Sequence, residues 1–305
     1  MLKKIFYGIV FGILGLIIIS FIFGKVQQQF YLSQVERVNV IHLNGTIEES
    51  TSDYLQNINP RLVSQKLKRA ANDDTIKGVV LRVNSPGGSV AASQEIADMI
   101  RDFEKPLVVS MGDMAASGGY YISTPADRII AHPGTMTGSI GVIMETINTE
   151  KLEKKIGIKR ETIKSGKHKD LFQGELSQKE RQILQEVTDE AYQQFVKEIV
   201  RSRDLKKEKV KELATGQIYT GSQALENGLV DKLGGIDDAI NTISKIAGLK
   251  NPKRYEYPSP GLFDTLKGGL SNMVTVLMGN TVSNKFLYWK KILLDNSLRL
   301  RYEIR

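Results

Sequence analysis

Twenty consecutive uncharged and mostly apolar residues lie between Lys4 and Lys25. As a helix rising about 1.5 Å per residue, this run would span about 30 Å, the thickness of the hydrocarbon core of a bilayer. A buried core helix and a cleaved signal peptide are the alternatives. A cleaved signal has a shorter apolar region and ends in small residues, whereas this run ends in the bulky segment Phe21–Phe23. We therefore expect a retained membrane anchor within residues 1–25.

The charges that flank the apolar run set its expected orientation. Lys3, Lys4 and the free amino terminus outweigh Lys25 on the other side. Because positive flanks stay on the cytoplasmic side of a membrane, the amino terminus is expected in the cytoplasm. The rest of the chain is then extracytoplasmic, held at the cell membrane by a single pass.

Positive charge is concentrated at the two ends of the chain. The sequence has 42 Lys and Arg residues against 34 Asp and Glu, a net charge of +8. Residues 1–25 and 267–305 together hold ten of these basic residues and only two of the acidic ones, so the body between them is neutral. Nucleic-acid binding requires basic charge clustered on the folded body, so we expect no nucleic-acid partner.

The chain is expected to have three parts. Residues 1–25 form the cytoplasmic stub and anchor, residues 26–257 form the body, and residues 258–305 form a basic amphipathic tail. The tail combines apolar clusters such as Phe286–Trp289 with nearby lysines and arginines. It is interpreted either as a subunit-packing helix or as an element that lies on anionic lipid.

Cysteine and histidine usage excludes several kinds of site. The chain has no cysteine, which excludes disulfides, cysteine-bound zinc, iron–sulfur clusters and a thiol nucleophile. Three histidines leave little room for a metal site built from imidazoles. Neither a phosphate-binding P-loop nor the GxGxxG pattern of dinucleotide-binding folds is present. We expect no metal and no cofactor.

The body alternates between β-branched runs and helical stretches, a pattern typical of an α/β fold with mostly parallel strands. A helix start is marked explicitly by a capping box of Ser177 and Glu180. Strands are predicted at Val38–Ile47, Gly78–Val83, Pro106–Met111, Arg128–Ala131, Gly141–Ile147 and Lys159–Ile163. Helices are predicted at 60–71, 89–104, 149–156, 177–203, 206–213, 221–227 and 235–247.

Two of the predicted strands run into segments of small residues. The first ends in Pro86-Gly87-Gly88, where adjacent glycines at a helix start let backbone N–H groups approach a ligand oxygen. The second leads to Ser117-Gly118-Gly119, which would expose a serine hydroxyl beside a free amide. A tight strand-to-helix turn and a helix cap are the plain alternatives at these two places.

A serine nucleophile requires a base. Nothing in the sequence singles out His42, His132 or His168 for this role. The run from 164 to 170 also offers Lys164, Lys167 and Lys169, and a lysine can act as a base if it is held neutral. From an ordinary pKa of about 10.4, keeping an amine neutral at pH 7 costs on the order of 4–5 kcal/mol, which only a buried and preorganised site can supply.

Five separate segments occur in the order and approximate spacing typical of the signal peptide peptidase A family, and the sequence closely resembles that family from about residue 35 to 250. It is most similar to the shorter, single-repeat form found in Gram-positive bacteria. The segments are Asn84–Gly88, Ser110–Ile122, Thr137–Val142, Lys164–Asp170 and Tyr219–Asp231.

The resemblance implies a role for each matching residue. Ser117 matches the nucleophile and Lys169 the general base, while the amides of Gly88 and Gly118 match the oxyanion hole. Ser139 matches a hydroxyl that orients the lysine in relatives. The implied fold is that of Clp protease and crotonase. Single-length relatives assemble into octameric rings, in which the serine and the lysine can come from neighbouring subunits.

The leading hypothesis is a membrane-anchored serine endopeptidase whose protease domain is residues 26–257. Its Ser117/Lys169 dyad would cleave remnant signal peptides and other short, apolar, unfolded segments. A crotonase-type enzyme that processes acyl-CoA is the alternative enzyme, because that fold also pairs glycine amides as an oxyanion hole. A catalytically silent scaffold tethered to the membrane is the alternative outside enzymes.

Overall fold

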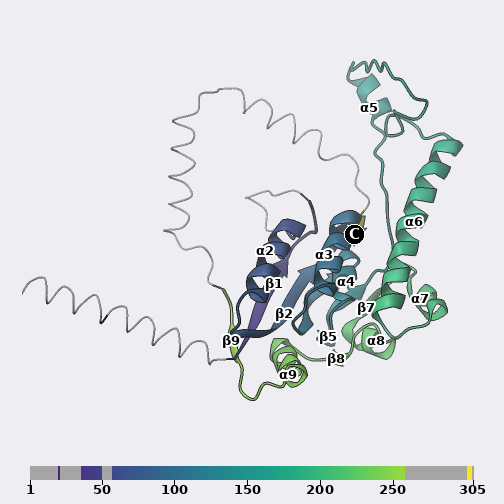
Figure 1. Ribbon diagram of the computed structural model, residues 1–305. Coiled ribbons are helices and arrows are strands. Elements are labelled where there is room, and N and C mark those ends of the chain that lie inside the picture. The colour runs from purple at the N-terminus through teal and green to yellow at the C-terminus, as the bar shows by residue number, and fades with distance from the viewer. Residues whose placement is uncertain (1–19, 21–35, 50–56, 258–300, 304–305) are drawn as a thin grey trace, which may run out of the picture.

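The computed structural model describes residues 36–49 and 57–257, together with residue 20 and a short strand at 301–303 (Figure 1). The predicted anchor, apart from residue 20, and most of the predicted tail lie outside the described residues. Within the described part of the chain, no helix is both long and apolar enough to cross a membrane.

The described chain alternates between strands and helices. The strands are β1 (Arg37–Asn44), β2 (Ile76–Ser85), β3 (Gly87–Ser89), β4 (Leu107–Ala116), β5 (Arg128–Ala131), β6 (Met136–Gly138), β7 (Ile218–Thr220), β8 (Lys232–Leu233), β9 (Lys253–Tyr255) and β10 (Arg301–Glu303). The helices are α2 (Pro60–Ala71), α3 (Val90–Arg101), α4 (Gly118–Ser123), α5 (Glu150–Lys155), α6 (Gln178–Ser202), α7 (Lys207–Leu213), α8 (Gly221–Glu226) and α9 (Ile236–Ile246).

A mostly parallel sheet of eight strands forms the centre of the fold. Its main path runs β7-β6-β4-β2-β1-β9, and all neighbours on this path are parallel except β6 and β7. The strand β4 branches the sheet, because its first half pairs with β5 and its last three residues pair with β6. The predicted α/β class with mostly parallel strands is confirmed.

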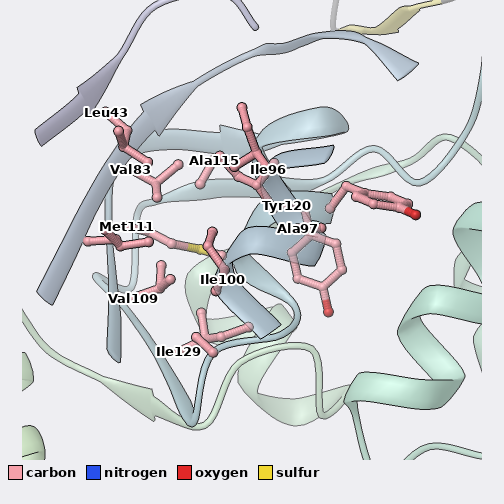
Figure 2. Packing of buried hydrophobic residues seen from close by; sticks show 14 of the residues in the cluster. Leu43, Val83, Ile96, Ala97, Ile100, Val109, Met111, Ala115, Tyr120 and Ile129 are labelled. Atoms are coloured by element: carbon pink, nitrogen blue, oxygen red, sulfur yellow. The ribbon is translucent and has the colours of Figure 1, made fainter. Parts of the chain in front are cut away.

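Helices cover both faces of the sheet, and each face has its own apolar cluster. On one face, Val80 and Val108 pack with Ala239 and Ile243 of α9. On the other face, a larger cluster joins the strands to α2, α3 and α4. Figure 2 shows the part of this cluster that lies between the strands, α3 and α4. Strands buried on both faces read as nearly continuous apolar runs, which is why β1, β2, β4 and β5 could be predicted from the sequence.

The helix α6 is buried only in its carboxyl-terminal half. Its buried residues all follow residue 190, and the Glu198 carboxylate joins it to the body through an ion pair with Arg101 of α3, in which nitrogen and oxygen are 2.5 Å apart. The Thr124 hydroxyl donates to the same carboxylate at 3.3 Å. We call residues 147–190 the arm, since α5 lies at the end of α6 that is farther from the sheet (Figure 1).

The predicted capping box at the start of α6 is confirmed. The Ser177 hydroxyl accepts a hydrogen bond from the Glu180 amide, and the Ser177 amide donates to the Glu180 carboxylate at 2.9 Å. This local pairing satisfies backbone donors at a helix end that projects into solvent. It therefore fixes where the helix begins without help from the core.

Two strand predictions are wrong. The segments Gly141–Ile147 and Lys159–Ile163 form no named strand of the structure. Their β-branched residues favour extended backbone, but Ile147 and Ile163 are 83% and 96% exposed, so no neighbouring strand or helix covers them. A strand needs a partner for its backbone groups as well as a favourable composition.

Candidate active site

Ser117 occupies a strained position between β4 and α4. Its φ is 53° and its ψ is −118°, a backbone conformation that side-chain-bearing residues rarely adopt and that costs about 1–3 kcal/mol. Its amide donates to the Gly138 carbonyl at 2.8 Å, and its carbonyl accepts from the Tyr121 amide at 2.8 Å. The side chain is 1% exposed, and within the described chain its hydroxyl has no hydrogen-bond partner. The fold thus holds a free hydroxyl rigidly at a strand end.

An irregularity in β4 places this strand end. Val83 of β2 pairs with Met111, but Ser85 pairs with Ala115, so β4 has two extra residues over this stretch. The Asn84 side chain fills the resulting gap and accepts a hydrogen bond from the Met114 amide at 3.1 Å. Bulges of this kind commonly re-aim a strand next to a functional site.

Gly88 and Gly118 lie next to each other because neither has a side chain. A Cβ atom added to Gly118 would lie 3.2 Å from the Gly88 nitrogen and 2.7 Å from the Ser93 hydroxyl oxygen. A Cβ atom added to Gly88, whose φ is +151°, would lie 2.1 Å from the Ile47 carbonyl oxygen. The backbones of β3 and α4 therefore approach closely beside Ser117, as two amides must if they are to bind one oxyanion.

Ser139 is joined to Ser117 through the backbone of β6. The carbonyl of Gly138 receives the Ser117 amide, and the next amide, that of Ser139, donates to the Gln217 carbonyl at 2.8 Å. Ser139 has a φ of 48° and is 8% exposed. Among the described residues, Ser117 and Ser139 are the two non-glycine residues with positive φ. Backbone strain is thus concentrated at the two candidate serines.

Lys169 lies on the arm and is exposed. The loop that carries it is closed by Lys164, whose amine contacts the Asp170 carboxylate at 2.5 and 2.6 Å. This contact holds the pKa of Asp170 below its usual range. His168 Nδ1 lies 3.5 Å from the Glu180 carboxylate, which ties the loop to the first turn of α6.

The chain does not bring Lys169 to Ser117. Tyr192 of α6 lines the same cavity as Ser139, so it marks a part of α6 that lies close to Ser139. Tyr192 follows Glu180 by twelve residues, which is about 18 Å along the axis of α6. The lysine loop is held at the Glu180 end, whereas Ser139 and Ser117 lie toward the other end. Among the described residues, the candidate nucleophile and the candidate base are therefore separate.

The histidines that sequence reasoning left open as bases make other contacts. His42 Nε2 lies 3.5 Å from the Glu256 carboxylate, and His168 lies beside Glu180 as described above. The ring of His132 packs near Gly235, at the start of α9. None of these contacts involves the Ser117 hydroxyl.

Comparison with known proteins identifies the family. Residues 99–250 match the model for peptidase family S49. A protein of Enterococcus faecium named "Putative signal peptide peptidase SppA" is 35% identical over 87% of this chain and 76% of its own length. The chain belongs to peptidase family S49.

Two further similar proteins illustrate the range of the similarity. The chloroplastic serine protease SPPA of Arabidopsis thaliana is 34% identical over 70% of this chain and 33% of its own length. A solved structure of a mutant 1510-N membrane-bound stomatin-specific protease, in complex with a substrate peptide, is 16% identical with a TM-score of 0.49. It covers 78% of this chain and 99% of that one. The expected resemblance to the signal peptide peptidase A family is confirmed, and so is serine endopeptidase activity.

The S49 site has features that the sequence did not reveal. Ser93 of α3 lies close to Gly118, where a side chain on that glycine would meet it. The Ser93 hydroxyl donates a hydrogen bond to the Ser89 carbonyl at 2.8 Å. The strand β10 pairs antiparallel with β3, with Tyr302 opposite Gly88, and it also contacts α4. The edge of β3 beside the candidate oxyanion hole therefore accepts an extended chain. No local signal in the sequence could reveal a contact across more than 200 residues.

Proposed function

We propose that this S49 peptidase is a membrane-anchored endopeptidase that cleaves remnant signal peptides and other short apolar segments with a Ser117/Lys169 dyad. The observation that carries the proposal is the strained, buried Ser117, with an unpartnered hydroxyl beside two closely packed glycine segments. The fold is inferred to be of the Clp protease and crotonase type. The anchor places the amino terminus in the cytoplasm and the protease domain outside.

Each residue has one role in the proposed reaction. The Ser117 hydroxyl attacks the scissile carbonyl carbon and passes its proton to the Lys169 amine, while the amides of Gly88 and Gly118 hold the negative oxygen. The C–N bond then breaks, and the lysine returns the proton to the departing amine. Water hydrolyses the serine ester by the same proton path, which regenerates the free enzyme.

The separation of Lys169 from Ser117 supports a site shared between subunits. A lysine that acts as a base must be held in a buried, preorganised site, and Lys169 is exposed within its own chain. A neighbouring subunit can bury that amine against Ser139 and so provide a base that one chain lacks. We infer that the active enzyme is a homo-oligomer, an octameric ring as in single-length relatives.

Mixing two inactive variants tests this proposal. Ser117→Ala and Lys169→Ala full-length chains are purified separately in detergent and are each expected to lose at least about a hundredfold in peptide hydrolysis. Unfolding and reassembling them together is expected to restore activity, because some sites then combine an intact serine with an intact lysine. Full activity of either variant alone would refute the dyad. Failure of the mixture to recover, despite mixed assembly seen by mass, would refute the shared site.

A peptide-library digestion by the wild type and Ser117→Ala tests the substrate class. The proposed function predicts cleavage within short apolar stretches and labelling of Ser117 by a serine-directed acylating probe. Cleavage restricted to charged sequences would contradict the assignment to signal peptides while leaving the peptidase chemistry intact.

A further inference from the structure

The irregular stretch of β4 just before Ser117 depends on side chains for its hydrogen bonds. We call residues 111–115 the β4 bulge. The step from Val83 to Ser85 in β2 lies opposite a step twice as long in β4, so residues 112–114 leave the ladder that β4 forms with β2. Buried backbone groups that leave a ladder need other hydrogen-bond partners. The donors and acceptors that side chains supply to the bulge therefore decide its shape.

Thr135 holds the middle of the bulge. Its hydroxyl donates a hydrogen bond to the Gly112 carbonyl at 2.8 Å and accepts one from the His132 amide at 3.1 Å. Thr135 is 2% exposed, and Gly112 is also buried. A buried carbonyl that loses its donor has no water to replace it, so the hydroxyl fixes where the bulge lies against the turn between β5 and β6.

The strand β6, which begins directly after Thr135, holds the path from the bulge to the nucleophile. The Thr137 hydroxyl donates to the Ala115 carbonyl at 2.7 Å, and the Gly138 carbonyl accepts the Ser117 amide at 2.8 Å. Residues 135–138 thus hold β4 at three successive points that end at Ser117. A shift of the bulge against this segment would change the direction in which the serine hydroxyl points.

Arg82 holds the start of the bulge from the β2 side. Its Nη1 donates to the Met111 carbonyl at 2.6 Å and lies 2.8 Å from the Ser110 hydroxyl oxygen. Asn84, two residues later in β2, receives the Met114 amide as described above. Side chains of β2 therefore fix one end of the bulge and its far side, while Thr135 fixes the middle.

We propose that Thr135 and Arg82 are positioning residues for the nucleophile, which keep the β4 bulge in the one shape that aims Ser117 at the substrate. A strained conformation such as that of Ser117 persists only where the surrounding structure determines it fully, and these contacts supply that constraint. The inference rests on the proposed role of Ser117. It adds two residues that lie outside the five segments that resemble the signal peptide peptidase A family.

A matched pair of substitutions tests Thr135. Thr135→Val keeps the shape of the side chain and removes the hydroxyl, whereas Thr135→Ser keeps the hydroxyl. Because a displacement of about 1 Å at a reacting group is costly, Thr135→Val is expected to lower kcat at least about tenfold with KM within about threefold of the wild type. Thr135→Ser is expected to retain kcat within about threefold. Equal losses in the two variants would overturn the role of the hydroxyl.

Thr242→Val is the control for loss of stability alone. The Thr242 hydroxyl donates to the Asp238 carbonyl at 2.7 Å within α9, so the variant removes a similar hydrogen bond away from the bulge. We expect it to lower the melting temperature without changing kcat. The rate at which a serine-directed acylating probe labels Ser117 is measured beside kcat, and it should fall at least about tenfold in Thr135→Val and stay unchanged in Thr242→Val. Folded, assembled Thr135→Val enzyme with wild-type kcat and labelling rate would overturn the proposal.

Arg82→Met tests the bulge from the other side and serves if Thr135→Val does not fold. It removes the donor to the Met111 carbonyl and should likewise lower kcat and the labelling rate at least about tenfold with little change in KM. A fall in melting temperature alone would overturn the role of Arg82.

The positioning proposal and the proposed function fail differently. If the wild type cleaves peptides and its Ser117 is labelled but neither Thr135→Val nor Arg82→Met lowers kcat, the nucleophile stands and the positioning role is wrong. If Ser117→Ala keeps full activity, the assignment of the nucleophile fails, whatever the variants at the bulge show.

Discussion

Replacing Gly88 with alanine should inactivate the enzyme while leaving most of its fold in place. The added Cβ would lie 2.1 Å from the Ile47 carbonyl oxygen, whereas ordinary contacts of this kind begin near 3.4 Å. Relief of the overlap therefore requires a shift of about 1.3 Å. The same carbonyl accepts the Ser89 amide at 2.8 Å, so β3 cannot move without losing that hydrogen bond.

The effect on catalysis follows from this shift. A hydrogen bond to a developing oxyanion is lost when its donor moves by about 1 Å, and loss of one such donor lowers kcat by about 10²–10³. The positive φ of Gly88 adds about 1–3 kcal/mol of backbone strain to the alanine variant. We therefore expect a large fall in kcat with a moderate fall in melting temperature.

A steady-state peptide assay, together with thermal unfolding and mass measurement of the assembly, checks this prediction. Gly134→Ala is the matched control, because a Cβ there meets nothing within 4 Å and Gly134 has no positive φ. We expect it to behave as the wild type. Assembled Gly88→Ala enzyme with a kcat within threefold of the wild type would refute the assignment of the Gly88 amide to the oxyanion hole.

Three further predictions follow from the site and the arm. Gly118→Ala places a Cβ 2.7 Å from the Ser93 hydroxyl, so kcat should fall at least about tenfold. Adding Ser93→Ala should recover part of this loss. Equal activity of the single and double variants would contradict this packing. A chain that ends at residue 300 should show a higher kcat/KM for peptides than the full-length chain, because residues 301–303 occupy the edge of β3. An unchanged kcat/KM would show that this strand pairing does not compete with substrate. Because Lys164 lowers the pKa of Asp170, their contact stabilises the lysine loop above the usual carboxyl pKa and is lost as the pH falls below about 4 through the lowered value. Hydrogen-exchange protection factors of the loop should fall in that range, whereas Lys164→Met should show low protection already at neutral pH.

The parts of the fold that could be predicted are those in which local composition and burial agree. The strands β1, β2, β4 and β5 are buried on both faces and rich in β-branched residues, a composition that favours a buried strand over a helix or a loop. The three-residue strands β3, β6, β7 and β9 of the body were not predicted, because three residues carry no periodic signal. The two wrong strands lie on or beside the arm, where composition favours extended backbone but no core is available.

The candidate site also has residues that could be predicted from the sequence and an arrangement that could not. Ser117 and Gly118 are marked locally by small residues between a strand and a helix, and the structure places them next to Gly88. The distance of Lys169 from this group depends on how α6 docks through Arg101 and Glu198, residues almost one hundred positions apart. The order of motifs along a chain shows which residues match the functional residues of a family. It does not show whether one copy of the chain can bring those residues together.

Separation of the two candidate catalytic groups has a consequence for control of the enzyme. The strained conformation of Ser117 is held by β4, β6 and α4 of the same chain, so it does not require a second subunit. Neutralising a lysine amine costs on the order of 4–5 kcal/mol and requires burial, which an exposed loop on the arm does not provide. On our proposal, an isolated chain therefore carries a prepared nucleophile without its base. Proteolysis then depends on the concentration of assembled subunits.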